Sequence, residues 1–205
     1  MPQCALVSQS TLFYHGSIIP NHVLELRDAA RSGCISEWRR QGGEMTDDTI
    51  VHEHPVWRER ADFIIAAEID PPSATARWRW EQLWARQVAK NRFRLCCIPF
   101  FIYDLALDDE VEAGEEAHRV YVVERVTKPS GRHTFRAWFH NSDVRREVAD
   151  ELVRLGCLIE WRSVRGNLLA IDAASDSLAR AAADFLWDRE QRGQLTYEAG
   201  RTKVD

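Results

Sequence analysis

The chain has 205 residues, of which 45% are hydrophobic and 29% are charged. This composition is typical of a globular protein and excludes a disordered or fibrous one. Asp and Glu (32) outnumber Lys and Arg (27), and the net charge of -5 disfavours general binding to nucleic acids or anionic lipids. Because no basic segment with a following apolar run opens the chain and no run of about 18 apolar residues occurs, we expect a cytoplasmic protein without membrane contact.

The cysteines indicate a reducing compartment. They are odd in number and contain no C-x-x-C pair, so they do not form a disulfide framework; they are Cys4, Cys34, Cys96, Cys97 and Cys157. Cys96 and Cys97 would point to opposite faces of one strand, which disfavours a shared metal. We therefore expect reduced thiols that pack as small hydrophobic side chains.

The first 44 residues show little periodicity and are predicted to be a poorly structured extension. Gly42-Gly43-Glu44 can be encoded by purine-rich codons of the kind that precede bacterial start codons. Two interpretations stay open: a true start at Met45, or an ordinary N-terminal extension.

Residues 61–70 are rich in β-branched and apolar side chains and end at Pro71-Pro72, which predicts a strand. Trp80, Leu83 and Trp84 follow with i, i+3, i+4 spacing. That spacing predicts a helical turn before the chain extends again.

Lys90-Asn91 separates two runs of strand-forming residues, which predicts a hairpin. Further short strands are predicted at residues 110–113, 120–126 and 134–140. Residues 45–130 should therefore form a β-rich half, built as a small curled antiparallel sheet or barrel.

The apolar period changes after His140. Asn141-Ser142-Asp143 can cap a helix that ends at Gly156, and Ser175 or Asp176 can cap a second one. Strands are predicted at residues 157–164, 168–173 and 195–198. With the strand at 134–140, the order is βαββαβ, so we predict an α+β protein whose residues 131–205 form a ferredoxin-like half.

Several short motifs occur in a definite order. They are Pro99-Phe100-Phe101, Asp108-Asp109-Glu110-Val111, Ser130-Gly131 with Thr134 and Arg136, Gly156-Cys157 with Glu160, and Leu195-Thr196-Tyr197-Glu198. Over about residues 61–198, this series resembles a bacterial family known as domain of unknown function number 4265. The resemblance implies a barrel-like part followed by a helix and strands, and no activity, since the family has none assigned. Asp108 stands where the family tends to have glycine, the residue that most easily adopts a positive φ.

Polar side chains around one turn form the candidate binding site, together with a carboxylate on a later strand: Ser130, Arg132, His133, Arg136 and Glu160. No strained elbow, third member or oxyanion site accompanies Ser130 and His133, so we predict no catalytic residue. We hypothesise a groove that binds an anion or a partner's carboxylates. In the structural alternative, Ser130 forms the turn while Arg132 and His133 are solvated or pair with acidic residues.

No metal or cofactor is predicted. His52 and His54 lack a third ligand nearby, the acidic residues 104–110 lack the spacing of a calcium loop, and no glycine-rich phosphate loop occurs. Basic and aromatic residues alternate only in Arg77-Trp78-Arg79-Trp80, so the tryptophans are expected in the core and no nucleic acid is expected as partner.

These observations favour a non-catalytic binding or regulatory module that recognises a protein partner or a small ligand. Its acidity suits a basic partner, as for an immunity-like factor. The alternative is a small-molecule enzyme in which Ser130, Arg132, His133 and Glu160 converge where the two halves meet.

Overall fold

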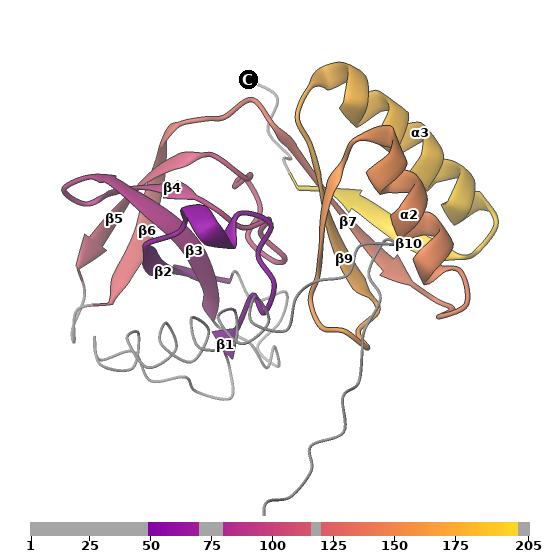
Figure 1. Cartoon of the computed structure of the whole chain (residues 1–205), viewed down its shortest axis with the longest axis horizontal. Helices are drawn as coiled ribbons and strands as arrows, with labels where there is room; N and C mark the ends of the chain where they lie inside the picture. Colours follow the sequence, from indigo (N-terminus) through magenta and orange to yellow (C-terminus); the bar gives the residue numbers. More distant parts are fainter. Residues whose placement is uncertain (1–48, 70–79, 116–119, 201–205) are drawn as a thin grey trace, which may run out of the picture. The chain divides into compact units, whose positions relative to one another are not determined.

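The computed structural model describes residues 49–69, 80–115 and 120–200, all within one compact unit. The predicted extension, the predicted start at Met45 and the proline pair after residue 70 lie outside the described residues. Strands dominate the described part and form two sheets (Figure 1). None of the helices in this part is long and apolar enough to cross a membrane.

The first sheet contains six strands: β1 (Thr49–Ile50), β2 (Phe63–Glu68), β3 (Trp80–Ala89), β4 (Arg92–Leu95), β5 (Glu110–Glu115) and β6 (Tyr121–Lys128). A short 3-10 helix, η1 (Arg58–Arg60), precedes β2. The strand order is β1-β3-β2-β6-β5-β4, and β3 also pairs with β4. This last pairing closes five strands into a barrel, which leaves no open edge among them.

The helical turn predicted at Trp80 to Trp84 was wrong, because these residues begin strand β3. Leu83 and Trp84 are both buried although neighbours on a strand face opposite sides. The Arg58 guanidinium lies 4.1 Å from the Trp84 ring centroid, and the indole N–H donates to the carbonyl of His52. Because both faces of β3 are covered here, with Glu81 and Gln82 buried as well, the alternation of apolar and polar residues that marks a half-exposed strand is missing.

The hairpin predicted at Lys90-Asn91 is confirmed. Ala89 pairs with Arg92, and Asn91 takes a φ of 57° between them. Asp108 also has a positive φ, 67°, at the position where the resembling family tends to have glycine. Asp and Asn adopt this region more readily than other side chains, so the turn persists without glycine.

The second sheet contains β7 (His133–Phe139), β8 (Leu158–Trp161), β9 (Leu168–Ala173) and β10 (Leu195–Ala199), in the antiparallel order β10-β7-β9-β8. Helices α2 (Arg145–Leu155) and α3 (Asp176–Gln191) cover one of its faces (Figure 1). Phe139, Leu152 and Leu186 are among the fully buried residues of this core.

The opposite face of this sheet is also partly buried. Leu168 and Ala170 of β9 belong to a second core, which includes Ile50, Ile98 and Phe100 from the chain before β5. The four-stranded sheet is thus covered by helices on one side and joined to the barrel part of the chain on the other.

The predicted fold class, α+β with a ferredoxin-like βαββαβ half, was wrong. Among the described residues, the strands contain more residues than the two α-helices, and the first sheet is a closed barrel. That sheet is also not purely antiparallel, because β2 pairs with β6, and β1 with β3, in parallel. The β2–β6 pairing, which joins Ala66 to Val122 and without which the barrel is not closed, and the core shared between the sheets join residues far apart in sequence, which local periodicity does not reveal.

The helix ends follow local rules with one exception. Gly156 ends α2 in the left-handed region at φ 105°, as predicted, and the Ser175 side chain caps α3 by accepting from the N–H of Leu178. The predicted cap of α2 was wrong: its N-cap is Val144, without a side-chain bond. Asn141 accepts the N–H of Asp143 instead.

Substitution Gly156→Ala should destabilise the protein by about 1 kcal/mol, because a Cβ disfavours the left-handed region. Gly156→Asn should cost less, since asparagine tolerates this region. Urea denaturation followed by circular dichroism measures both. Equal stability of the alanine variant and the wild type would contradict the strained-turn interpretation.

Candidate functional site

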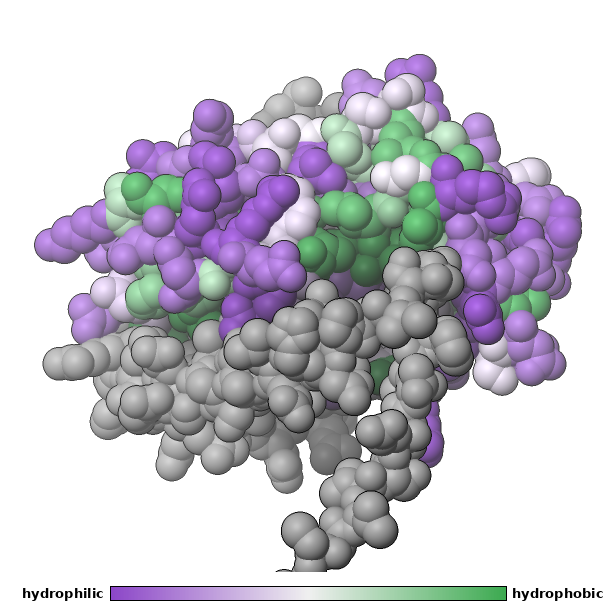
Figure 2. Space-filling view, viewed as in Figure 1, coloured by the Kyte–Doolittle hydropathy of each residue, from purple (hydrophilic) through white to green (hydrophobic). Residues whose placement is uncertain are grey.

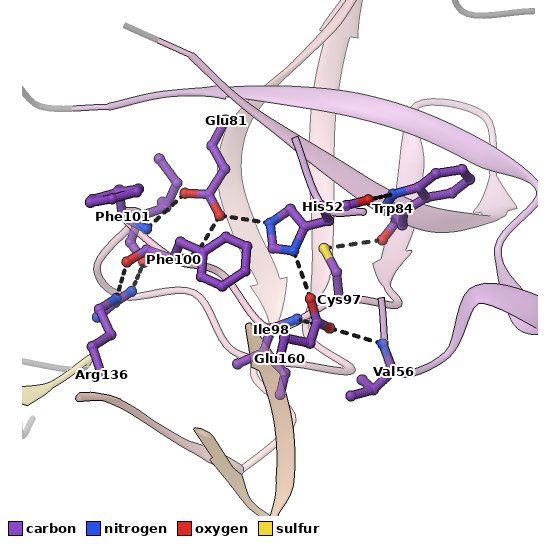
Figure 3. Close-up of polar contacts among 11 residues, drawn as sticks. His52, Val56, Glu81, Trp84, Cys97, Ile98, Phe100, Phe101, Arg136 and Glu160 are labelled. Carbon is purple, nitrogen blue, oxygen red and sulfur yellow. Dashed lines mark hydrogen bonds and ion pairs between the residues drawn. The ribbon is translucent and has the colours of Figure 1, made fainter. Parts of the chain in front are cut away.

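A buried histidine between two carboxylates joins three distant segments of the chain (Figure 3). His52 Nε2 lies 2.9 Å from Glu81 Oε1, and His52 Nδ1 lies 2.7 Å from Glu160 Oε2. The three residues are 0 to 3% exposed. The imidazole also stacks on Phe100 at a centroid distance of 4.3 Å.

Backbone N–H groups complete the shell of both carboxylates. Glu81 accepts from Phe100 at 2.6 Å and from Phe101 at 2.8 Å. Glu160 Oε1 accepts from Ile98 at 2.8 Å and from Val56 at 2.9 Å. Since all four carboxylate oxygens accept hydrogen bonds, the cost of burying the two charges is offset within the protein.

The surroundings of His52 favour its protonated form. Burial alone lowers the pKa of His52, but the carboxylates of Glu160 and Glu81 outweigh burial and raise it from 6.5 to about 9. At neutral pH, the group is therefore an imidazolium held between two acceptors. It has no unprotonated nitrogen with which to act as a base or to bind a metal.

Arg136 makes a second connection between the sheets. From β7, its Nε donates to the carbonyl of Phe100 and its Nη2 to the carbonyl of Ile102, the latter at 2.6 Å (Figure 3). Its guanidinium lies 4.6 Å from the ring centroid of Tyr103, and burial lowers its pKa. Arg136 is only 3% exposed. Its charged group therefore binds backbone carbonyls within the protein and is not exposed to solvent.

The remaining predicted site residues take separate partners. Arg132 forms a two-pronged ion pair with the buried Asp172. His133 lies 2.8 Å from Asp176 at the surface. Ser130 donates its backbone N–H to Asp109, and its hydroxyl accepts from the N–H of Arg132.

The five residues therefore do not converge on one another. Arg136 and Glu160 each bond to the segment at residues 98–102, but Glu160 does so beside His52, whereas Ser130, Arg132 and His133 occupy three other contacts. Ligand or partner binding by these five residues stays a prediction. What the structure shows is that their charged groups bond within the protein.

Sequence reasoning missed His52 and Glu81. His52 was weighed only as half of a pair with His54, but His52 is buried whereas His54 is exposed. Glu81 lies in β3 beside Gln82, in a strand that also carries Arg86 and Gln87, so its charge does not stand out in the sequence. Only the structure shows that it is buried and paired.

The described cysteines are unreactive in this environment. Cys96, Cys97 and Cys157 are free and buried, as predicted for packed thiols. Burial raises the pKa of Cys96 and of Cys157 to about 11, and raises that of Cys97 further above its usual value. These side chains remain protonated near neutral pH and so lack the thiolate that a nucleophile needs.

An open pocket of about 300 Å³ lies beside this buried network. Its aromatic lining consists of Phe100, Phe101, Trp138 and Tyr197, and Arg136 and Glu198 also contact it. Trp138 is 49% exposed. Figure 2 shows apolar surface exposed between polar regions on one face of the described residues.

The structure thus defines a β-rich, two-sheet protein whose sheets are joined by buried charges and which has an open aromatic pocket. The family model for "Domain of unknown function (DUF4265)" matches residues 81–197, so the chain belongs to this family, as predicted. A solved structure, "Novel crystal structure of a hypothetical protein from Neisseria gonorrhoeae", is similar with a TM-score of 0.58 and 16% identity, over 69% of this chain and 96% of that one. At this identity, the likeness concerns the fold alone. No curated protein matches the sequence.

Substitution Glu160→Gln should destabilise the protein by about 3 to 5 kcal/mol, because it leaves the buried imidazolium with one carboxylate. The matched control is Glu59→Gln at an exposed position, which should change stability by less than about 0.5 kcal/mol. Urea denaturation measures both variants. A loss below about 1 kcal/mol for Glu160→Gln would show that the buried pair contributes little.

The raised pKa of His52 predicts a pH dependence of stability. The folded state holds the proton more tightly than the unfolded state, so this contribution is complete below pH 6.5, declines as pH rises, and is lost above about pH 9. The full change is about 3 kcal/mol, since each pKa unit corresponds to about 1.4 kcal/mol.

The test compares urea denaturation between pH 6.5 and 9 for three proteins. The wild type and the exposed-histidine control His54→Asn should lose stability in parallel as pH rises. His52→Gln should be less stable throughout and lack this component of the slope. A slope that is unchanged in His52→Gln would assign the pH dependence to other groups.

Proposed function

We propose that the protein is a non-catalytic binding module and that the pocket beside β7 and β10 is its ligand-binding site. The main support for this proposal is the open pocket of about 300 Å³ with an aromatic lining. A half-exposed tryptophan at such a position is a common feature of interaction sites, because its large apolar surface gains most when a ligand covers it.

The buried charges between the two sheets support binding rather than catalysis. His52, Arg132 and Arg136 all direct their charged groups to partners within the protein. A general base or nucleophile must instead reach the substrate. For this reason, we prefer the binding module to the alternative, an enzyme in which Ser130, Arg132, His133 and Glu160 act together.

The ligand we propose is a protein partner or a small molecule, and an immunity-like role is one that this acidic chain could fulfil. The net charge of -5 favours a basic partner through long-range attraction. The pocket supplies the apolar contact that such attraction does not provide.

Blocking the pocket should abolish binding without unfolding the protein. Thr196 lines the pocket from an exposed position, so Thr196→Trp should fill it with little loss of stability. The control Gln191→Trp adds the same side chain at the exposed end of α3. A panel of small aromatic and apolar fragments, screened against the full chain by NMR, supplies the probes.

Fragments should shift the Trp138 indole resonance in the wild type and in Gln191→Trp, and the affinity should fall at least about tenfold in Thr196→Trp, equivalent to about 1.4 kcal/mol. If no fragment shifts that resonance, or if binding is unaffected by Thr196→Trp, the pocket is not the ligand site.

A further inference from the structure

Two side chains bordering the pocket have few side-chain contacts with the rest of the described residues. Trp138 is 49% exposed, and its indole forms no hydrogen bond, ring contact or cation contact with residues 49–69, 80–115 or 120–200. Glu198 is exposed; its carboxylate accepts a hydrogen bond from the Tyr103 hydroxyl to Oε1 at 2.6 Å, and its charge partly offsets the lowering of the Arg136 pKa by burial, but it forms no salt bridge with the described residues. An indole face and an oriented carboxylate are both available to a ligand.

The strand register places these two groups side by side. Trp138 pairs with Thr196 and Arg136 pairs with Glu198, so Trp138 and Glu198 are diagonal neighbours on the same face of β7 and β10. Diagonal neighbours have side chains about 7 to 8 Å apart, within reach of long side chains. One ligand group can therefore contact the indole and the carboxylate together.

The sign of the accessible charge is negative. Arg136 also lines the pocket, but Nε and Nη2 donate to carbonyls. Its Nη1 has no partner among the described residues, yet it is buried close to Gly200, where an added Cβ would lie 2.9 Å away. An anion in the pocket thus meets no exposed guanidinium nitrogen, whereas a cation meets the Glu198 carboxylate.

Aromatic faces attract cations as well. Arg162 already lies over the Phe101 ring at 5.8 Å from its centroid, so one face of that ring is in use. Among the described residues, no cation lies over the Trp138 ring, and tryptophan is the side chain that attracts cations most strongly.

We propose that the pocket binds a cationic side chain, an arginine or lysine of a partner protein, between the face of Trp138 and the carboxylate of Glu198. This inference rests on the proposed function. A partner's side chain fits better than a free small molecule, because small-molecule sites enclose most of their ligand whereas Trp138 and Glu198 are exposed. The acidic net charge of -5 suits the same partner.

The experiment compares two peptides, acetyl-Gly-Gly-Arg-Gly-Gly-amide and its citrulline analogue, which has the same shape without the charge. Titrations of the full chain follow the indole N–H resonance of Trp138 by NMR, assigned with Trp138→Phe. The arginine peptide should bind at least about tenfold more tightly than the citrulline peptide, and added salt should reduce the difference.

Variants assign this preference to one carboxylate. Glu198→Gln should abolish the difference between the peptides while leaving citrulline binding unchanged, and Glu124→Gln, at an exposed position of β6, should preserve it. Equal binding of the two peptides to the wild type, or a preference that survives Glu198→Gln, would overturn the inference while leaving the pocket as the proposed site. If neither peptide nor the fragment panel shifts Trp138, both the inference and the proposed function fail.

Discussion

The positive charge of His52, buried between Glu81 and Glu160, is the constraint on which the rest of the structure depends. A buried charge is tolerated only when opposite charges and hydrogen bonds surround it, so the segments that carry the two carboxylates must meet at this point. The Glu81 carboxylate also accepts hydrogen bonds from the backbone N–H groups of Phe100 and Phe101, whose rings line the pocket. The network that joins the two sheets therefore also fixes one wall of the pocket.

This network gives the family motifs a structural meaning. In the motif Pro99-Phe100-Phe101, the N–H groups of Phe100 and Phe101 donate to Glu81, and the carbonyl of Phe100 accepts from Arg136 of the third motif. Asp109 of the second motif accepts from Ala106 and Ser130. Glu160, in the motif after α2, completes the shell of His52. Motifs of this kind, which could be interpreted as a catalytic signature, are explained by the need to hold two sheets together.

Features with a local cause were predictable from the sequence, whereas those with a distant cause were not. The hairpin at Lys90-Asn91 and the helix end at Gly156 depend on the backbone preferences of the residues themselves. His52, by contrast, contacts residues 29 and 108 positions away in the sequence, and the residues next to it in the sequence do not indicate these partners. The parallel pairing of β2 with β6 was not predictable for the same reason, because it joins Ala66 to Val122 and is needed to close the barrel. The position of Trp138 could have been predicted from the sequence, because the alternation of side chains along a strand places it on the same face as Arg136.

The pocket and the network are physically continuous through Tyr103. The Arg136 guanidinium lies over the Tyr103 ring, and the Tyr103 hydroxyl donates a hydrogen bond that orients the carboxylate of Glu198. Burial raises the pKa of this hydroxyl and Glu198 raises it further, so the hydroxyl keeps its proton and remains a donor at neutral pH. A ligand that contacts Glu198 and Trp138 therefore acts on residues that are anchored to the junction. By mass action, any ligand that binds this arrangement and not the unfolded chain must stabilise the joined sheets. For this reason, ligand affinity at the pocket and the stability of the contact between the two sheets should depend on the same network of residues.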